Sequence, residues 1–246
     1  MPKRLISATP TQRARLPDGR RIYAVGDIHG CAVLLADILN RIDNDVAYRP
    51  AARVLQVFLG DYIDRGPDSR EVIDLLIARQ RKGNVVFLKG NHEDCAIRFL
   101  SDPETLPQWK NIGGLNTVAS YGVTAADYRA AASRRAIADA LRSSMPVTHL
   151  SFLHKLALSF TCGDFFFAHA GVRPGIALDQ QSPDDLLWIR DDFLSHEESF
   201  GKVVVHGHTP SHEPVIRPNR INIDTGAYAT GRLTCLVLEG DRVNFL

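Results

Sequence analysis

The chain of 246 residues is 45% hydrophobic and 23% charged, which is ordinary for a folded globular protein of one large or two small domains. Its formal net charge of +1 excludes a global electrostatic attraction to nucleic acid or to an anionic membrane. Any anionic substrate must therefore be held by a local group of residues.

The four cysteines lie far apart and form no Cys-x-x-Cys pair: Cys31, Cys95, Cys162 and Cys235. This spacing argues against a disulfide framework and a structural zinc site, and it favours reduced thiols. No apolar run is long enough to span a membrane, and the basic N-terminus is not followed by the apolar segment of a signal peptide. We therefore expect a cytoplasmic protein without a membrane or nucleic-acid partner, and the sequence leaves its oligomeric state open.

The sequence predicts a basic tail followed by one domain. Residues 1–20 carry several Lys and Arg residues with scattered Pro and Thr, a composition typical of a loosely held segment. Residues 21–246 are predicted to form a single domain.

The first half of that domain alternates apolar runs typical of buried strands with amphipathic runs typical of helices. In chain order it predicts a strand, a helix, a strand, a helix and a strand, then a helix from near Glu93: Ile22–Val25, Val33–Ile42, Val54–Leu59, Ser69–Arg81 and Val85–Leu88. Such alternation needs right-handed crossovers and gives a mainly parallel sheet. The loops that follow the three strands therefore lie at one edge.

The segment from Ser101 to Lys155 changes to Ala-rich and Arg-rich helical sequence, interrupted by Gly113-Gly114 and ended by Pro146. We predict a helical insert that covers part of the site. Strand patterns then return, with one further helix near Pro183–Leu194: Leu156–Cys162, Phe165–Ala168, Val203–Val205, Ile221–Ile223, Leu233–Leu238 and Val243–Leu246. Gly-Asp turns at 163–164 and 240–241 predict hairpins, so we expect a more antiparallel second sheet.

Polar side chains stand between glycines in the three loops that follow the first strands: Gly26-Asp27-Ile28-His29-Gly30, Gly60-Asp61-Tyr62-Ile63-Asp64-Arg65-Gly66 and Gly90-Asn91-His92-Glu93. Glycine lets the backbone adopt positive φ and lets a ligand approach closely. Two later histidines, His169 and His208, end apolar strands in the same way. The site would thus combine carboxylates, imidazoles and one amide oxygen.

A mixed set of oxygen and nitrogen ligands without thiolate suits Mn²⁺, Fe or Zn²⁺ better than Ca²⁺. The number of candidate ligands suffices for two divalent ions, and Asp61 in the middle loop is the carboxylate that we expect both to share. Two-metal sites hold their ions about 3.5–4 Å apart and clamp the attacking and leaving oxygens of an in-line displacement. We expect Mn²⁺, with Fe or Zn²⁺ as alternatives.

The ordered motifs GDIHG, GDYIDRG, GNHE, AHAG and GHTP resemble those of the PPP-type metallophosphoesterases, specifically the compact bacterial and phage serine/threonine protein phosphatases. The resemblance runs from about Ile22 to the C-terminus. It implies the α/β fold of calcineurin-like phosphoesterases, in which two mixed β-sheets pack as a sandwich flanked by helices. It departs at Ile112, where related bacterial sequences usually place Asn before the Gly pair.

The resemblance also implies roles for ten residues. Asp27 and His29 would bind the first metal, Asp61 would bridge, and the second metal would be bound by Asn91, His169 and His208. His92 would protonate the leaving alkoxide and Asp64 would orient His92, while Arg65 and Arg190 would clamp the phosphate oxygens.

Several of these residues also have plainer interpretations. Taken alone, His169 after an aromatic run would be a buried structural histidine, and Arg190 among acidic residues would be an exposed ion pair. His206 is treated as a neighbour of the site, and Glu93 suits the start of its helix. Tyr228 either faces the substrate or packs.

We therefore predict a two-metal hydrolase of phosphate monoesters, a serine/threonine protein phosphatase that works by direct attack of a hydroxide bridging the metals. Its substrate would be a phosphoprotein or a phosphorylated small molecule. The alternative is a symmetrical dinucleoside polyphosphate (diadenosine tetraphosphate) hydrolase, against which the intact Asp64-Arg65 pair argues by resemblance. A non-catalytic, metal-binding regulator is the lesser alternative.

Overall fold

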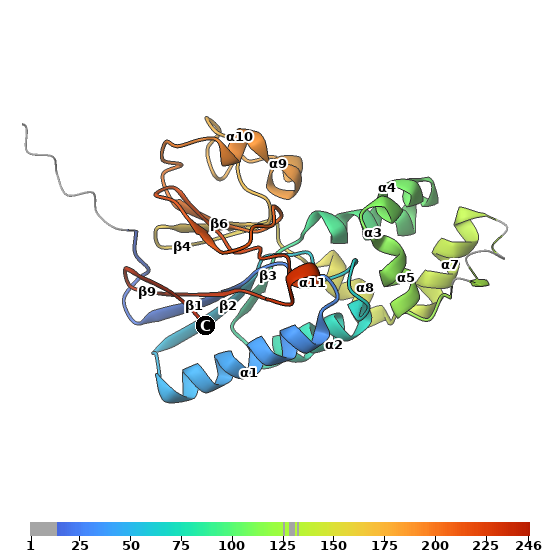
Figure 1. Ribbon diagram of the computed structural model, residues 1–246, viewed down its shortest axis with the longest axis horizontal. Helices are drawn as coiled ribbons and strands as arrows, with labels where there is room; N and C mark the ends of the chain where they lie inside the picture. The colour runs from blue at the N-terminus through green and yellow to red at the C-terminus, as the bar shows by residue number, and fades with distance from the viewer. Residues whose placement is uncertain (1–13, 125, 128–130, 132) are drawn as a thin grey trace, which may run out of the picture.

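The strands alternate their side chains between two cores, which explains why the chain builds layers. In β1 (Arg20–Val25), Tyr23 and Val25 point to a core shared with helices, whereas Ile22 and Ala24 point to a core shared with a second sheet. The computed structural model describes residues 14–124, 126–127, 131 and 133–246, and Figure 1 shows the two sheets stacked face to face.

The first sheet has the strand order β10-β9-β1-β2-β3. Its strands other than β1 are β2 (Arg53–Phe58), β3 (Val85–Phe87), β9 (Cys235–Glu239) and β10 (Arg242–Phe245). Strands β1, β2 and β3 run parallel, and the β9–β10 hairpin adds to β1 in the antiparallel sense. The crossovers between the parallel strands are α1 (Ala32–Tyr48) and α2 (Ser69–Gln80), which pack their buried faces on this sheet.

The second sheet has the order β4-β5-β6-β8-β7. Its strands are β4 (Ser159–Cys162), β5 (Phe165–Ala168), β6 (Val203–His206), β7 (Val215–Ile216) and β8 (Arg220–Asn222). The three central strands are parallel, and both edge strands are antiparallel to their neighbours. The short helices α9 (Pro183–Trp188) and α10 (Asp191–Leu194) cover its outer face through Leu186 and Phe193.

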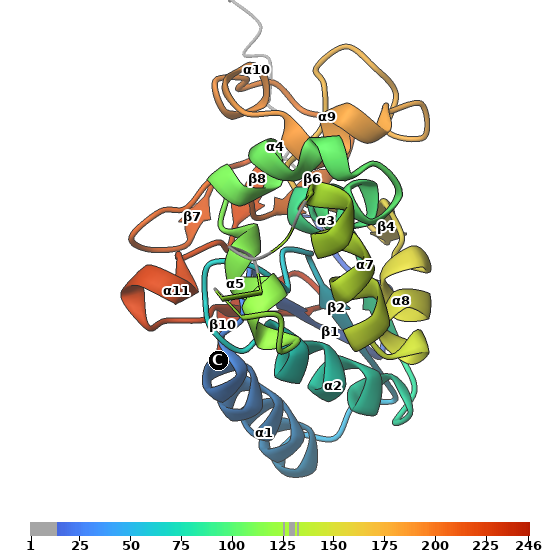
Figure 2. The same cartoon turned by 90° about the vertical axis from the view of Figure 1, so that its right-hand side faces the viewer.

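The helical insert lies at one end of the sandwich, as Figures 1 and 2 show. Its elements follow α3 (Asn91–Ser101) and are η1 (Pro103–Thr105), α4 (Leu106–Asn111), α5 (Gly114–Ser120), α7 (Arg134–Ser144) and α8 (Val147–His154). A last helix, α11 (Ala227–Thr230), follows β8. Within the residues that the structure describes, no helix is both long and apolar enough to cross a membrane.

Three expectations from the sequence need correction. The second sheet is parallel at its centre, and the last hairpin, β9–β10, belongs to the first sheet. The single helix expected over 183–194 is two helices separated at Ile189 and Arg190. In the expected tail, Leu16 is fully buried in the core between the sheets, so the ordered domain begins before residue 21; the tail's residues 1–13 lie outside the described residues.

Candidate metal and phosphate site

The six parallel strands of the two sheets end at the same edge of the sandwich, and their loops bring the predicted ligands together. Strands β1, β2 and β3 lead into the loops of Asp27, Asp61 and Asn91, while β5 and β6 lead into His169 and His208. Residues from five loops therefore meet because the carboxyl ends of parallel strands share one edge.

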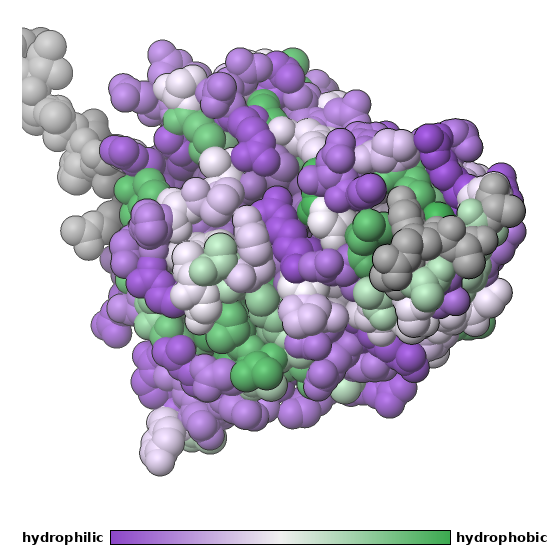
Figure 3. Space-filling view, turned by 45° about the vertical axis from the view of Figure 1, so that its right-hand side comes forward, coloured by the Kyte–Doolittle hydropathy of each residue, from purple (hydrophilic) through white to green (hydrophobic). Residues whose placement is uncertain are grey.

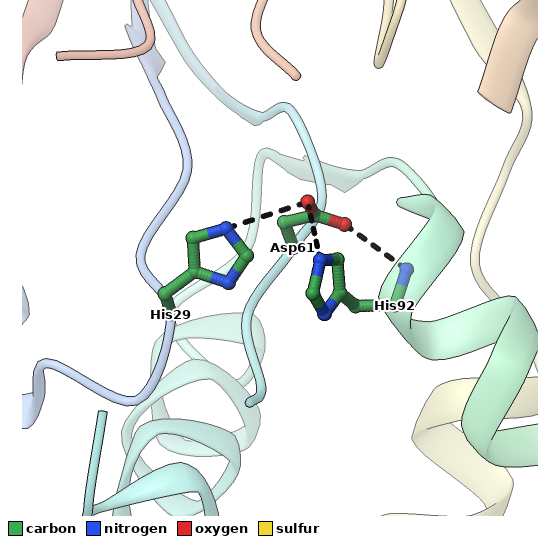
Figure 4. Close-up of side chains that lie close together, drawn as sticks. All are labelled: His29, Asp61 and His92. Carbon is green, nitrogen blue, oxygen red and sulfur yellow. Dashed lines mark hydrogen bonds and ion pairs between the residues drawn. The ribbon is translucent and has the colours of Figure 1, made fainter. Parts of the chain in front are cut away.

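Asp61 lies at the centre of this group. Its Oδ2 is 3.5 Å from His29 Nε2 and 3.6 Å from His92 Nε2, and Figure 4 shows both rings directed at the carboxylate. Its Oδ1 is 3.4 Å from His169 Nε2. Two sets of side chains could each hold a metal ion, one of His29, Asp61 and His92 and the other of Asp61, His169 and His208, and only Asp61 belongs to both.

Asn91 joins the second of these sets through its side-chain oxygen. Asn91 Oδ1 lies 3.0 Å from His169 Nε2 and 2.9 Å from His208 Nδ1. His169 is fixed from behind, because its Nδ1 lies 2.9 Å from the carbonyl oxygen of Leu59. Asn91, Asp61, His169 and His208 therefore form a compact donor set of two oxygens and two imidazoles.

Asp27 lies beside this group, outside both sets. Its Oδ2 accepts the backbone N–H of His208 at 3.0 Å, and its Oδ1 is buried without a hydrogen-bond partner among the described residues. A Cβ on Gly207 would lie 2.0 Å from that Oδ1, so the glycine is required for the carboxylate to reach the site. His208 Nε2 is likewise buried and has no hydrogen-bond partner in the described part of the chain. A buried oxygen and a buried nitrogen that lack hydrogen-bond partners are what a metal-binding site without its metal would contain.

The electrostatics of the group also fit divalent cations. Burial and the nearby Asp224 and Asp61 raise the pKa of Asp27, which is the effect of gathering carboxylates without a compensating charge. Burial lowers the pKa of His29 to about 3 and that of His208 to about 2, so both imidazoles stay neutral. Neutral imidazole is the form that binds metal. The residues present therefore suit two divalent ions, with oxygen and nitrogen ligands only.

His92 and Asp64 form a buried pair next to Asp61. His92 Nδ1 lies 2.7 Å from Asp64 Oδ2, which turns Nε2 toward the centre of the site. Burial lowers the pKa of His92, but the carboxylates of Asp61 and Asp64 outweigh it and leave that pKa raised. An imidazole held by a carboxylate in this way can carry a proton to a leaving group.

Two residues of the insert that the sequence did not predict also bind Asp64. Trp109 Nε1 donates to Asp64 Oδ2 at 2.8 Å, and the Thr117 hydroxyl donates to Asp64 Oδ1 at 2.6 Å. The carboxylate is fully buried and accepts from three side chains. Ile112, which replaces the expected Asn, is half-buried and packs on the core.

The backbone of the site is strained. Among the described residues, six other than glycine have positive φ, and five of them belong to the site: His29, Asp61, Asp64, Arg65 and His208. This region of φ is unfavourable for residues with a Cβ, and it persists only where surrounding contacts enforce it. The clustering of strain is an independent sign that these loops serve function rather than stability.

The two predicted phosphate-binding arginines are available. Arg65 places its guanidinium carbon 4.7 Å from the ring centroid of Tyr228, and that ring, 43% exposed, also packs edge-on against His29 at 5.3 Å. Tyr228 therefore faces the site. Arg190 is exposed and contacts Thr209 Oγ1 at 3.3 Å. Within the described part of the chain, neither guanidinium is paired with a carboxylate.

Three further buried residues lie in or beside the loops of the site. Glu93 is fully buried and accepts backbone N–H groups of the Asp61 loop, a role beyond the start of a helix. Asp224, after β8, is a buried carboxylate whose pKa is raised to about 6 by burial, and the sequence did not single it out. His206 is buried against the ring of Phe193 and belongs to neither ligand set.

Residues 20–241 match the family model of the calcineurin-like phosphoesterases. The chain belongs to this family. The match covers the insert, every loop of the site and all strands of both sheets except β10, so the predicted fold class is confirmed. The phosphoesterase is also similar to curated relatives named bis(5′-nucleosyl)-tetraphosphatase PrpE, asymmetrical. The relative from Anoxybacillus flavithermus is 31% identical over 86% of this chain and 88% of its own; that from Bacillus subtilis is 31% identical over 85% and 87%.

Solved structures share the fold of this phosphoesterase at lower identity. A candidate diadenosine tetraphosphatase superposes with a TM-score of 0.64 at 20% identity, covering 97% of this chain and 95% of its own. A cold-active protein tyrosine phosphatase superposes with a TM-score of 0.55 at 17% identity, covering 94% and 81%. The chain is thus a metal-dependent phosphoesterase, and the narrower assignment to the serine/threonine phosphatases does not follow from the names of these relatives.

Proposed function

We propose that this phosphoesterase hydrolyses dinucleoside tetraphosphates asymmetrically, to a nucleoside triphosphate and a nucleoside monophosphate. The observation that carries the proposal is that the site holds two guanidinium groups, Arg65 and Arg190, that no carboxylate of the described residues pairs with. The charge of Arg65 acts on Asp27, His29 and His92, that of Arg190 acts on His169 and His208, and both act on Asp224. The two arginines thus flank the ligand group, an arrangement that suits a substrate with several phosphates in a row.

The names of the relatives support the same substrate and specify the mode of cleavage. Relatives with 31% identity over nearly the whole chain are named as asymmetrical tetraphosphatases. We therefore propose asymmetrical hydrolysis in place of the symmetrical reaction that the sequence suggested as an alternative.

In the proposed mechanism, Arg65 and Arg190 bind phosphate oxygens and orient the phosphorus for in-line attack by water. Divalent ions, for which we propose Mn²⁺ with Fe or Zn²⁺ as alternatives, would supply activation of that water and polarisation of the phosphoryl group. The water oxygen loses one proton to the solvent and forms a bond to phosphorus as the bond to the leaving oxygen breaks, and the electron pair of that bond stays on the leaving oxygen. His92 Nε2 gives its proton to the leaving oxygen, while Asp64 holds the opposite face of the ring.

Hydrolysis of phosphoserine or phosphothreonine in proteins is the second candidate, and one observation favours it. A serine alkoxide is a poor leaving group that needs a proton donor, and the buried pair of His92 and Asp64 supplies one. A nucleotide phosphate, with a second pKa of about 6, leaves more readily without a proton. The geometry of this pair therefore serves a monoester at least as well as an anhydride.

The two candidates give different products. The purified protein, loaded with Mn²⁺, would be incubated with diadenosine tetraphosphate and with a phosphoserine peptide, and Asp61→Asn would serve as the blank. We expect ATP and AMP in equal amounts from the nucleotide. Two equivalents of ADP would show symmetrical cleavage, phosphate from the peptide alone would establish the protein phosphatase, and no product with metals bound would favour the regulator.

A further inference from the structure

The segment Trp109–Thr117 of the helical insert makes contacts that a mere cover over the site would not need. We propose that this segment is part of the catalytic apparatus and that Trp109 and Thr117 are positioning residues, which aim the proton of His92 at the leaving group by fixing Asp64. The proposal rests on the proposed function in one respect, since it takes His92 as the proton donor.

The hydrogen bonds to Asp64 account for the whole of its carboxylate. Oδ2 accepts from Trp109 Nε1 at 2.8 Å and pairs with His92 Nδ1 at 2.7 Å, and Oδ1 accepts from Thr117 at 2.6 Å. Burial raises the pKa of Asp64, and the donors on both oxygens oppose this rise because they stabilise the ionised carboxylate. They also prevent rotation of the carboxylate, so the imidazole keeps Nδ1–H on Asp64 and presents Nε2 to the site.

The same segment holds the strained backbone of the catalytic loop. Asp64 and Arg65 have φ of 71° and 63°. Asp64 N–H donates to Thr117 Oγ1 at 2.9 Å, Arg65 N–H donates to the carbonyl of Gly113 at 3.4 Å, and the Asn116 side-chain amide donates to the carbonyl of Arg65. Contacts from the insert therefore enforce a conformation that the loop would not adopt alone.

The Gly113-Gly114 pair makes this docking possible. A Cβ on Gly113 would lie 2.9 Å from the backbone nitrogen of Arg65, and one on Gly114 would lie 2.5 Å from the indole ring of Trp109. Gly113 also has φ of 106°, which disfavours any other residue. The insert thus contacts the loop of Asp64 and Arg65 at the Gly113-Gly114 pair. The missing side chains leave room for the backbone of Arg65 and for the indole of Trp109.

The step that depends on this arrangement is proton transfer to the leaving oxygen. As the bond between phosphorus and that oxygen breaks, the proton on His92 Nε2 moves to the oxygen, and the electron pair of the broken bond stays there. A misaligned imidazole slows this step only where the leaving group needs the proton. The loss should therefore grow with the basicity of the leaving group.

Thr117→Val is the main test, because it removes the hydroxyl and keeps the size and branching of the side chain. Thr117→Ser restores the hydroxyl, and Trp109→Phe removes the second donor while it keeps a ring against Phe99, 5.2 Å away. Tyr121→Phe is the matched control: it removes a hydrogen bond of 2.8 Å to His149 within the same insert and does not involve Asp64. Rates are compared on p-nitrophenyl phosphate and on phenyl phosphate, which differ in leaving group but little in shape.

We expect Thr117→Val and Trp109→Phe to lower kcat on phenyl phosphate about tenfold and on p-nitrophenyl phosphate less than about threefold, as loss of one hydrogen bond to a charged group implies. Thr117→Ser should recover the rate, and Tyr121→Phe should retain it on both substrates. Equal losses on both substrates would show that the two residues act only on stability, and would overturn the proposal.

A spectroscopic measurement separates this inference from the proposed function. The proton that His92 Nδ1 shares with Asp64 should give a strongly downfield NMR resonance in the wild-type protein, and Thr117→Val should shift or broaden it. If the wild type releases no ATP and AMP from diadenosine tetraphosphate, the proposed function fails, while this resonance still tests the positioning of His92. An unchanged resonance in both Thr117→Val and Trp109→Phe would refute it.

Discussion

The carboxylate of Glu93 accepts the backbone N–H of Asp61 at 2.9 Å, so that a residue in the first turn of α3 holds the loop of the central metal ligand. It also accepts the N–H groups of Tyr62 at 2.7 Å and of Gly90 at 2.9 Å. One buried side chain thus ties the loop after β2 to the start of α3. Asp61 and Asn91 depend on it for their spacing.

Glu93→Gln should destabilise the fold. The glutamine would replace one accepting carboxylate oxygen by an NH₂ group, which faces backbone N–H donors and leaves at least one of them without an acceptor. Leaving a buried donor unsatisfied costs about 1–3 kcal/mol, so we expect a loss of about 2–3 kcal/mol in the free energy of unfolding. Urea unfolding of the metal-free protein would measure it. The matched control is Glu104→Gln, an exposed glutamate paired with Arg134, which should change stability by less than about 0.5 kcal/mol. Similar values for both variants would contradict the role of Glu93.

Apart from Arg190, which lies between α9 and α10, the site residues that the sequence predicted lie at or just beyond the ends of apolar strands. His169 and His208 were found this way, because parallel strands deliver their C-terminal residues to one edge wherever they lie along the chain. The converging positions of the predicted ligands thus follow from local patterns together with one rule of topology.

The sequence does not predict contacts between residues that lie far apart along the chain, because such contacts leave no local pattern. Trp109 and Thr117 bind Asp64 from 45 and 53 residues away, and each is an ordinary residue for a buried helix face. The placement of β9 and β10 failed for the same reason, since an apolar hairpin fits the edge of either sheet. The Gly113-Gly114 pair is a local sign that another part of the chain approaches the backbone closely. It does not show which residues make that approach.

The roles of Asp61 and His92 should separate in metal content. Asp61→Asn removes the charge that both ligand sets share, so we expect it to lose both metals. His92→Asn should keep both metals. The pairing of His92 Nδ1 with Asp64 indicates proton transfer and not metal binding as the role of His92, and Asp27 Oδ1 is a buried oxygen that can bind an ion in its place. The kcat of His92→Asn should fall by about 10²–10⁴, the usual contribution of a general acid. Since His92 Nε2 also lies within reach of a metal ion, loss of one metal in His92→Asn would reassign it as a ligand.

Tyr228 should act on substrate binding through Arg65. A cation over an exposed aromatic ring is stabilised by about 0.5–1 kcal/mol, so Tyr228→Ala should raise KM about two- to fivefold with kcat nearly unchanged. Tyr228→Phe keeps the ring and should retain the wild-type KM. A raised KM in the Phe variant as well would mean that the hydroxyl itself contacts substrate, which steady-state kinetics on both variants would show.

Tyr23 should make the protein lose stability in alkali. Burial, with a hydrogen bond of 2.5 Å to Asp45, raises the pKa of Tyr23 to about 12. Because an unfolded tyrosine has a pKa of about 10, its contribution is complete below pH 10 and is lost as pH rises toward 12, by about 2–3 kcal/mol in all. Urea unfolding at stepped pH should show this loss reduced in Tyr23→Phe. The control Tyr48→Phe, at a tyrosine 88% exposed, should follow the wild type.

Arg190 and Arg173 provide a matched pair for the phosphate site. Arg190 is exposed and contacts the hydroxyl of Thr209, whereas Arg173 is bound to Asp185 at 2.6 Å and to Asp192 at 3.0 Å. A guanidinium already paired with two carboxylates has little left to offer a phosphate, while loss of a charged hydrogen bond to substrate costs about 1.5–3 kcal/mol. Arg190→Ala should therefore lower kcat/KM about ten- to a hundredfold without changing the free energy of unfolding, and Arg173→Ala should leave kcat/KM within about twofold. The reverse order of effects would place the phosphate over the loop of Arg173 and would withdraw Arg190 from the site.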